Sequence, residues 1–234
     1  MTGTLINVVA IIIGGLLGIL FGRRLSDNLK NTVIAGMGLF TTAIGFQMFL
    51  KTEQPLIVLG ALILGALLGE WWKIEERTQS LGMWLERRVK GSSEGATSQF
   101  VRGFLSASVL FCTGPMAILG SISDGLHGDY LTLSIKSILD GFISIAFAST
   151  LGMGVAFSAL PVLAYQGGIS LLAAQLNAIV TETMMNELTA TGGVILMGVG
   201  ISSILEMKKI RVANFLPALA IAPLLVYILS LVVR

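Results

Sequence analysis

Charged side chains are scarce in this chain. Only 12% of its 234 residues are Asp, Glu, Lys or Arg, whereas 54% are hydrophobic and the mean hydropathy is +0.88. A soluble domain carries roughly 25% charged residues, so the exterior of this protein is predicted to face lipid. The net charge is +2 and no basic stretch is interleaved with aromatic residues. We therefore expect the lipid bilayer as a partner and no nucleic acid.

Cysteine and histidine occur only once each, as Cys112 and His127. A single cysteine excludes an intrachain disulfide. The chain also lacks the His-Glu-x-x-His and Gly-x-Ser-x-Gly sequences of familiar hydrolases. The sequence therefore predicts no enzyme, no metal site and no cofactor.

Long apolar runs dominate what is present. A transmembrane helix needs about 20 predominantly apolar residues, and eight segments qualify. They run over about 4–22, 32–50, 55–72, 103–122, 131–153, 155–175, 189–206 and 212–233. The first Lys or Arg is Arg23, so the first run is predicted to be a retained span and not a cleaved signal peptide. The predicted fold class is an all-α polytopic membrane protein with about eight transmembrane helices.

Two interruptions divide this pattern. Gly114-Pro115 breaks the fourth span, because proline lacks an N–H and clashes with the preceding turn; the result is a broken helix or a re-entrant segment. Residues 73–90 are charged but carry apolar residues at helical spacing, which predicts an amphipathic helix at the membrane surface. A flexible linker is expected at 91–98. The tryptophans expected at headgroup level are Trp71, Trp72 and Trp84.

The basic residues predict an orientation. Twelve of the fifteen fall on one side if there are eight spans: Arg23, Arg24 and Lys30; Lys73, Arg77, Arg87, Arg88, Lys90 and Arg102; and Lys208, Lys209 and Arg211. The positive-inside rule makes that side cytoplasmic and places both termini outside. The segments 124–130 and 176–188 are then also outside. A seven-span arrangement with a re-entrant fourth segment would divide the basic loops between both sides, so eight spans are favoured.

Three pairs of segments suggest an internal repeat. GGLLGILFGRRLSDNL (14–29) aligns with GGISLLAAQLNAIVTETM (167–184), GLFTTAIG (38–45) with GVILMGVG (193–200), and ALILGALLG (61–69) with ALAIAPLLV (218–226). The offset stays between 153 and 157 residues. Spans one to three and six to eight are then inverted copies flanking a central helix pair, an architecture that many secondary transporters use. An old duplication that serves only as scaffold is the alternative. The predicted parts are repeat 1 (1–72), the amphipathic helix and linker (73–99), the central helices (100–154) and repeat 2 (155–234).

The central helices carry the candidate site. Lys136 and Asp140 share one helical face at i, i+4 spacing, and charged residues inside a membrane usually serve a function. A structural clasp is the alternative for this pair. The candidate residues for binding a solute or ion are Thr113, Gly114, Ser121, Ser123, Lys136, Ser137, Asp140 and Ser144.

Six further polar residues are gate or secondary candidates: Glu70, Asp124, His127, Asp129, Asn7 and Asn214. Glu70 is interpreted as a solvated helix end beside Trp71. The group from Asp124 to Asp129 is interpreted as a gate or turn in an outer loop. The two asparagines are expected to tie helices together.

Several of these residues carry a family resemblance. The segments Asn7…Gly14-Gly15…Gly18, Phe111-Cys112…Gly120…Gly125-x-x-Gly128-Asp129…Lys136-Ser137-x-x-Asp140 and Asn214-x-x-Pro217-Ala218-Leu219 resemble those of the YdfK/YqgA-like bacterial membrane proteins, domain of unknown function 554. The resemblance covers essentially the whole chain. It implies one full-length domain in the bacterial cytoplasmic (inner) membrane and a transport-related role, and it supplies no site residues.

Together these features predict a transporter or channel for a small solute or ion, acting as a homodimer. The alternative is a non-transporting assembly or regulatory partner, which would use the amphipathic segment 73–90 to dock a cytoplasmic protein.

Overall fold

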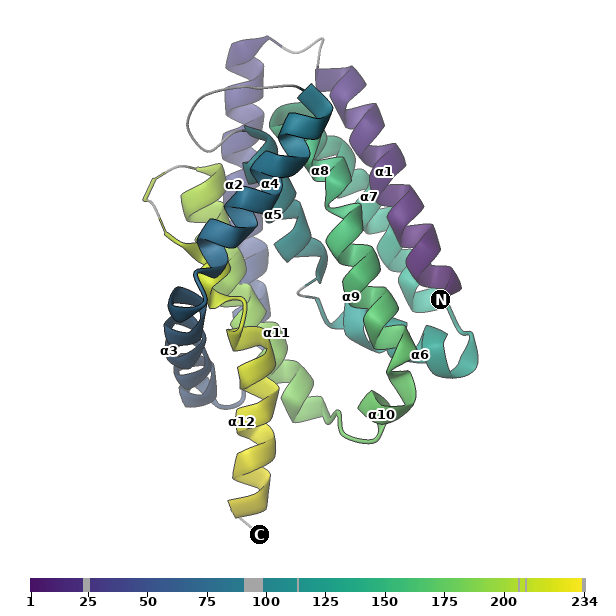
Figure 1. Cartoon of the computed structure of the whole chain (residues 1–234), viewed down its shortest axis with the longest axis vertical. Coiled ribbons are helices and arrows are strands. Elements are labelled where there is room, and N and C mark those ends of the chain that lie inside the picture. Colours follow the sequence, from purple (N-terminus) through teal and green to yellow (C-terminus); the bar gives the residue numbers. More distant parts are fainter. Residues whose placement is uncertain (23–25, 91–98, 113, 206, 209, 233–234) are drawn as a thin grey trace. The chain divides into compact units, whose positions relative to one another are not determined.

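The protein is all-helical, as the sequence predicts. A computed structural model describes residues 1–22, 26–90, 99–112, 114–205, 207–208 and 210–232, and no strand occurs among them. Its elements are shown in Figure 1: α1 (Thr2–Gly22), α2 (Asp27–Phe49), α3 (Pro55–Trp71), α4 (Ile74–Lys90), α5 (Gln99–Cys112), α6 (Pro115–His127), α7 (Leu131–Leu151), α8 (Gly154–Phe157), α9 (Ala159–Leu171), α10 (Ala173–Asn177), α11 (Glu182–Gly198), the π-helix η1 (Val199–Ile204), the 3₁₀-helix η2 (Val212–Phe215) and α12 (Ala218–Val232).

Between six and eight of these segments can cross a membrane. Six are long and apolar enough alone, and two more pass as bent pairs, α3 with α4 at 61° and α5 with α6 at 62°. The break predicted at Gly114-Pro115 is confirmed, because α5 ends at Cys112 and α6 begins at Pro115. The helix predicted over 73–90 is also confirmed as α4, whereas its place at the membrane surface stays a prediction. The predicted linker at 91–98 lies outside the described residues.

The chain divides into two compact units. The first contains Met1–Met37 and Gln79–Ile179, and the second contains Gly38–Thr78 and Val180–Arg234.

In the first unit, α1 and α7 pack closely through glycines. A Cβ on Gly14, Gly18 or Gly22 would collide with successive carbonyl oxygens of α7, those of Gly141, Ile145 and Ser149. These contacts advance together along both chains, so the two helices run in the same direction. Small residues allow this approach, which is how membrane helices gain packing energy without a hydrophobic drive.

The parallel direction of α1 and α7 bears on the break between α5 and α6. Two parallel helices that both cross a membrane must be separated by an odd number of crossings. The helices α2 and α3 and the bent pair α5–α6 supply three crossings if each spans once. A re-entrant α5–α6 would leave two crossings and an antiparallel α1–α7 pair. Where the bent pair α3–α4 is itself a crossing, the parallel α1–α7 pair requires α5–α6 to be a broken span.

The same helices give a mutational prediction. Gly18→Ala places a methyl group against the carbonyl of Ile145 and is expected to destabilise the protein by about 1–3 kcal/mol through overpacking. Gly36→Ala in α2 is the control, because a Cβ there meets nothing within 4 Å. Thermal unfolding of both variants in one detergent measures the difference. An equal loss at the two positions would contradict the close α1–α7 packing.

The helix α1 is apolar outside and small or polar inside. Its buried residues include five glycines together with Thr4 and Asn7, whereas Leu5, Val9 and Ile13 are exposed. A soluble protein would reverse this pattern. The exposed apolar face suits only a lipid environment or another protein.

The second unit is built on antiparallel helix pairs. Along α3 and α12, Gly65 lies against Ala218, and Gly69 lies against Asn214. Along α2 and α11, Gly45 lies against Gly193, with each glycine facing the carbonyl of the other. In both pairs, glycine allows the two helix backbones to approach closely because it has no side chain.

The sequence predicts that the seventh span starts at residue 189, but the helix in the structure starts earlier. α11 begins at Glu182, where the side chain of Thr181 caps the helix by accepting from the N–H of Met184 at 3.2 Å. Glu187, assigned to an outer loop by the sequence, is fully buried in α11. The expectation for this stretch is wrong because the Glu187 side chain accepts hydrogen bonds from a distant segment, which no hydropathy count can detect.

Candidate functional site

A buried ion pair lies on α7 in the first unit. The ammonium of Lys136 contacts Oδ2 of Asp140, and each residue is only 5% exposed. The shared face that the sequence predicts for these two residues is confirmed. Mutual contact lets two charges remain in a low-dielectric interior where either alone would be costly.

Two amides from other helices join the pair. Asn7 of α1 donates through Nδ2 to Oδ2 of Asp140 at 3.0 Å and to Oε1 of Gln166 of α9 at 3.4 Å. Both amides are fully buried. We call Asn7, Lys136, Asp140 and Gln166 the polar centre. It joins α1, α7 and α9, so the expectation that Asn7 ties helices together is confirmed.

Some polar atoms in and beside the polar centre have no hydrogen-bond partner. They are Oδ1 of Asn7, Nε2 of Gln166, Oγ of Ser144 and Oγ1 of Thr4, and all four residues are fully buried. Buried polar atoms are nearly always paired with protein or with ordered water. These atoms therefore mark positions for water or a bound ligand.

Lys136 has a second neighbour on α5. Its Nζ lies 5.7 Å from the centre of the Phe111 ring, within the range of a cation–π interaction. Phe111 precedes Cys112, the last residue of α5. The ammonium is thus close to the helix break as well as to Asp140.

The serines chosen from the sequence divide into two groups. Ser121 and Ser137 donate their hydroxyls to carbonyls of their own helices, at 2.5 Å and 2.6 Å. Ser123 makes only a 3.5 Å contact with Asp129. Ser144 is buried without a partner. Among these four, only Ser144 keeps a free hydroxyl on the face of Asp140.

At the break itself, Gly114 is the extended residue that precedes α6, with φ −84° and ψ 147°. No contact in the described part of the chain connects it to the polar centre. The candidate Thr113 lies outside the described residues.

Asp124 does not lie in an outer loop, which corrects the sequence interpretation. It belongs to α6, is 3% exposed and accepts from the N–H of Gly3 at 3.0 Å. The helix continues through Gly125, where the missing side chain admits the carbonyl of Ser170. The chain turns only at Gly128, whose φ of 67° favours glycine.

The rest of that predicted cluster is a turn. His127 and Asp129 are exposed, and Oδ1 of Asp129 accepts from the N–H of Leu131 at 3.1 Å, at the start of α7. No contact joins His127 to either acid in the described residues. The turn interpretation therefore suits Asp129 but not Asp124.

In the second unit, Glu70 and Asn214 meet each other. Nδ2 of Asn214 donates to Oε2 of Glu70 at 2.6 Å, and its Oδ1 accepts from the N–H of Glu75 at 2.8 Å. Arg211 also pairs with Glu70, at 2.5 Å with both side chains more than half exposed. The predicted roles, a helix tie for Asn214 and an exposed helix end for Glu70, are confirmed.

Gln166 and Glu187 are among the buried polar residues that sequence reasoning missed. Gln166 interrupts the apolar run 155–175, and an amide inside such a run is a signal that could have identified it. Glu187 had no comparable signal, because it follows several polar residues. Its carboxylate accepts from the hydroxyl of Thr52 at 2.7 Å and from the N–H groups of Glu53 at 2.8 Å and Gln54 at 2.9 Å. Glu187 thereby holds the turn before α3.

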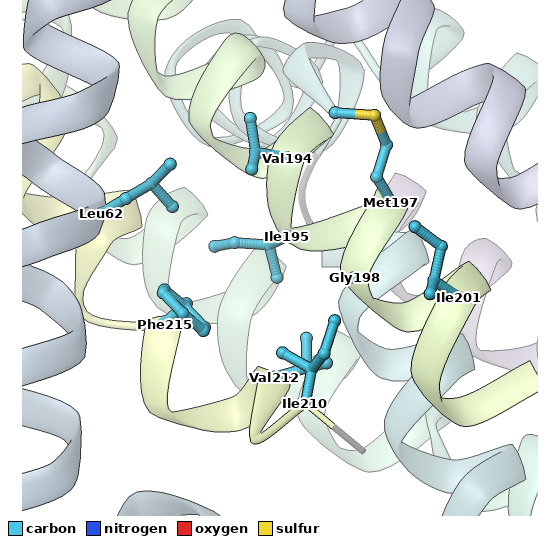
Figure 2. Close-up of a pocket in the computed structure, with 9 residues that line it drawn as sticks. All are labelled: Leu62, Val194, Ile195, Met197, Gly198, Ile201, Ile210, Val212 and Phe215. Carbon is cyan, nitrogen blue, oxygen red and sulfur yellow. The ribbon is translucent and has the colours of Figure 1, made fainter. Parts of the chain in front are cut away.

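A separate pocket of about 350 Å³ lies in the second unit, beside η1 (Figure 2). It is lined by Leu62, Val194, Ile195, Met197, Gly198, Ile201, Ile210, Val212 and Phe215. Every lining side chain is apolar, so no side chain of this pocket could bind an ion. The polar centre of the first unit is the stronger candidate site.

Comparison with known proteins identifies the family. Residues 2–227 match the family described as "Protein of unknown function (DUF554)". The chain belongs to this family. It is 32% identical to the uncharacterized membrane protein YdfK of Bacillus subtilis (strain 168), over 98% of this chain and 97% of that one. It is also 32% identical to the uncharacterized protein YqgA of Escherichia coli (strain K12), over 94% of each. No solved structure matches. The YdfK relative agrees with the membrane location that the apolar helices indicate.

Proposed function

We propose that this DUF554 protein moves a small solute or ion across the membrane through the polar centre of its first unit. The observation that carries the proposal is a buried Lys136–Asp140 pair with unpartnered polar atoms around it. Ionisable residues inside a membrane protein are expensive and usually line an ion or substrate path. A packed scaffold has no need for unpaired donors and acceptors at its centre.

Contacts in the second unit support the inverted repeat within this proposal. A two-fold relation between copies requires that a contact between two residues recur between their equivalents. Under the sequence alignment, Gly38 is equivalent to Gly193, and Gly45 to Gly200. Gly45 lies against Gly193, and a Cβ on Gly200 would lie 2.9 Å from the carbonyl oxygen of Gly38. The α2–α11 contacts therefore follow the expected symmetry.

The α3–α12 pair follows the same rule. Gly65 lies against Ala218, and their equivalents under the alignment are Ala222 and Ala61. Ala61, Ala218 and Ala222 form one buried cluster. The helices α2 and α3 thus pack antiparallel against their equivalents α11 and α12, which suits an inverted repeat.

A polar stretch of α1 supplies a route toward the centre. Asp124 accepts from the N–H of Gly3, the hydroxyl of Thr4 has no partner, and Asn7 reaches Asp140 one turn further on. We infer that access to the polar centre alternates between the two sides of the membrane as the broken span α5–α6 moves. Backbone freed by such a break is tolerated in a membrane where it lines a watery cavity.

The proposal places the protein in the bacterial cytoplasmic membrane, with both termini outside and two copies forming a dimer. Twelve of fifteen basic residues on one side support that orientation. The chain supplies binding and access in this scheme and carries out no chemical reaction.

Flux through proteoliposomes tests the proposal. Wild-type protein is expected to move at least one member of a panel of monovalent ions and small polar solutes. Asp140→Asn is expected to reduce that flux about tenfold or more, equivalent to about 1.4 kcal/mol, because it removes the charge at the polar centre. Glu182→Gln, on an exposed residue of α11, is the control and should retain full flux.

Absence of flux for the whole panel, together with a normal cellular phenotype for Asp140→Asn, would contradict transport. The alternative is then a membrane assembly or regulatory partner that docks through α4. Its exposed Leu81, Met83 and Trp84 favour this alternative, together with Arg88 placed 5.1 Å over the Trp84 ring. A partner captured by wild type and lost on Trp84→Ala, without flux, would support docking.

A further inference from the structure

We propose that Asp140 binds a sodium-sized monovalent cation, which takes the place of the Lys136 ammonium. This inference deepens the proposed function, on which it rests, by naming the class of ion that the polar centre handles. In the described structure Lys136 occupies the position that the free cation would take.

The contacts of Asp140 are concentrated on one oxygen. Both the ammonium of Lys136 and Nδ2 of Asn7 approach Oδ2. The lysine nitrogen is therefore a positive charge already bound at a carboxylate that has an amide beside it. A small mobile cation attracted to the same oxygen competes with this nitrogen, because two positive charges cannot share the position.

The amides of Asn7 and Gln166 are oriented for the lysine-bound state. Asn7 directs Nδ2 toward both Oδ2 of Asp140 and Oε1 of Gln166. Turning only one of these two amides would bring two N–H donors or two oxygen acceptors face to face. The hydrogen bonds therefore define the orientation of both amides. The atoms left without partners are Oδ1 of Asn7 and Nε2 of Gln166.

Turning both amides over together pairs these two atoms. Nε2 of Gln166 then donates to Oδ1 of Asn7, and that same oxygen faces the carboxylate of Asp140. An oxygen facing a carboxylate is repelled unless a positive charge lies between them. A cation held by Asp140 and Asn7 supplies that charge, so the second amide arrangement is the one that a bound cation stabilises.

The number and charge of the oxygens point to a monovalent metal ion. Ser144 lies one turn from Asp140 on α7, fully buried and with a hydroxyl that lacks a partner. A proton needs one oxygen, whereas a metal cation is held by several. Divalent ions favour several carboxylates, and no group of three or more His, Cys, Asp or Glu occurs in the described residues. One carboxylate with neutral oxygens suits an ion of single charge.

The displaced lysine has a place to go. The Phe111 ring lies 5.7 Å from its Nζ and attracts an ammonium through its face. Phe111 is in the last turn of α5, where helix carbonyls lack intrahelical partners and the helix dipole favours a positive charge. Cation binding would thus shift Lys136 toward the broken span, which couples the ion to the segment proposed to move.

Direct binding to the full-length protein tests this inference. Radioactive sodium binding is measured on protein in nanodiscs, at fixed pH and at ionic strength held constant with choline chloride. Wild type should bind sodium in preference to potassium, and Asp140→Asn should lose binding. Lys136→Met should bind sodium about tenfold more tightly or better, because the competing ammonium is gone, a gain of about 1.4 kcal/mol.

A matched pair of serine variants keeps the test independent of the charged residues. Ser144→Ala removes a proposed ligand and should weaken sodium binding several-fold. Ser134→Ala, also on α7, removes a hydroxyl that donates to the carbonyl of Tyr130 and should leave binding unchanged. Equal effects of the two variants would overturn the assignment of Ser144, even if Lys136→Met does not fold.

Binding and flux separate the two proposals. Flux of a solute with no sodium binding, or binding that Lys136→Met weakens, would overturn the cation inference and leave the proposed transport intact. Sodium binding without any flux would overturn the proposed transport and leave the cation inference intact. A protein that responds to pH but not to sodium would also overturn the metal-ion assignment.

Discussion

Lys136→Met is expected to lower the free energy of unfolding by about 3–5 kcal/mol, measured without sodium, because it leaves the buried Asp140 carboxylate unpaired. Asp140→Leu should cost a similar amount by leaving the ammonium unpaired. Both residues are 5% exposed, so bulk water does not solvate the charge that is left unpaired. Equilibrium unfolding in mixed detergent micelles measures the change.

The double variant Lys136→Met/Asp140→Leu is the decisive comparison. Removing both charges together leaves neither unpaired, and it should recover most of the stability lost in the single variants. A double-mutant cycle then gives the coupling between the two side chains. If the stability losses of the two single variants simply add in the double variant, the two charges do not depend on each other. That result would remove the basis for a buried site at which a cation replaces the lysine.

Glu187→Leu is expected to be the second large effect, at about 1–3 kcal/mol, because it removes the acceptor of three part-buried hydrogen bonds. The carboxylate accepts from the N–H groups of Glu53 and Gln54 and from the hydroxyl of Thr52. The N–H of Gln54 would keep only its 3.2 Å contact with the hydroxyl of Thr52, so the turn before α3 loses its main anchor. Thermal unfolding monitored by circular dichroism measures the loss.

The matched control for this prediction is Glu182→Leu, at the exposed start of the same helix. A surface change of this kind should alter stability by about 0.5 kcal/mol or less. Glu187→Gln should fall between the two, because its amide keeps one acceptor oxygen and loses the other. A mild effect of Glu187→Leu would mean that the turn is held in another way.

The positions of the spans follow from local properties of the chain. The length of an apolar run is set by the bilayer, and proline breaks a helix wherever it occurs inside one. For this reason the sequence predicts the break at Gly114-Pro115 and the ion pair of Lys136 and Asp140, whose spacing is fixed by their common helix.

Local properties of the chain do not show which residues from distant segments contact a given side chain. Whether Gln166 or Ser121 faces the pair depends on how α9 and α6 pack. Asp124 and Glu187 were assigned to loops because a carboxylate inside an apolar span is costly unless other segments bond to it. Gly3 supplies a donor for the first, and the turn at Thr52–Gln54 supplies three for the second.

The sequence by itself determined that this protein is a helical membrane protein, where most of its spans lie, and that one helix carries a lysine and an aspartate on one face. Only the tertiary structure decided that Asn7 and Gln166 complete the polar centre and that Asn7, Gln166 and Ser144 keep unpaired atoms there. The physical reason is that hydropathy and helical periodicity act along the chain. The satisfaction of a buried polar atom depends instead on groups brought from elsewhere in the chain.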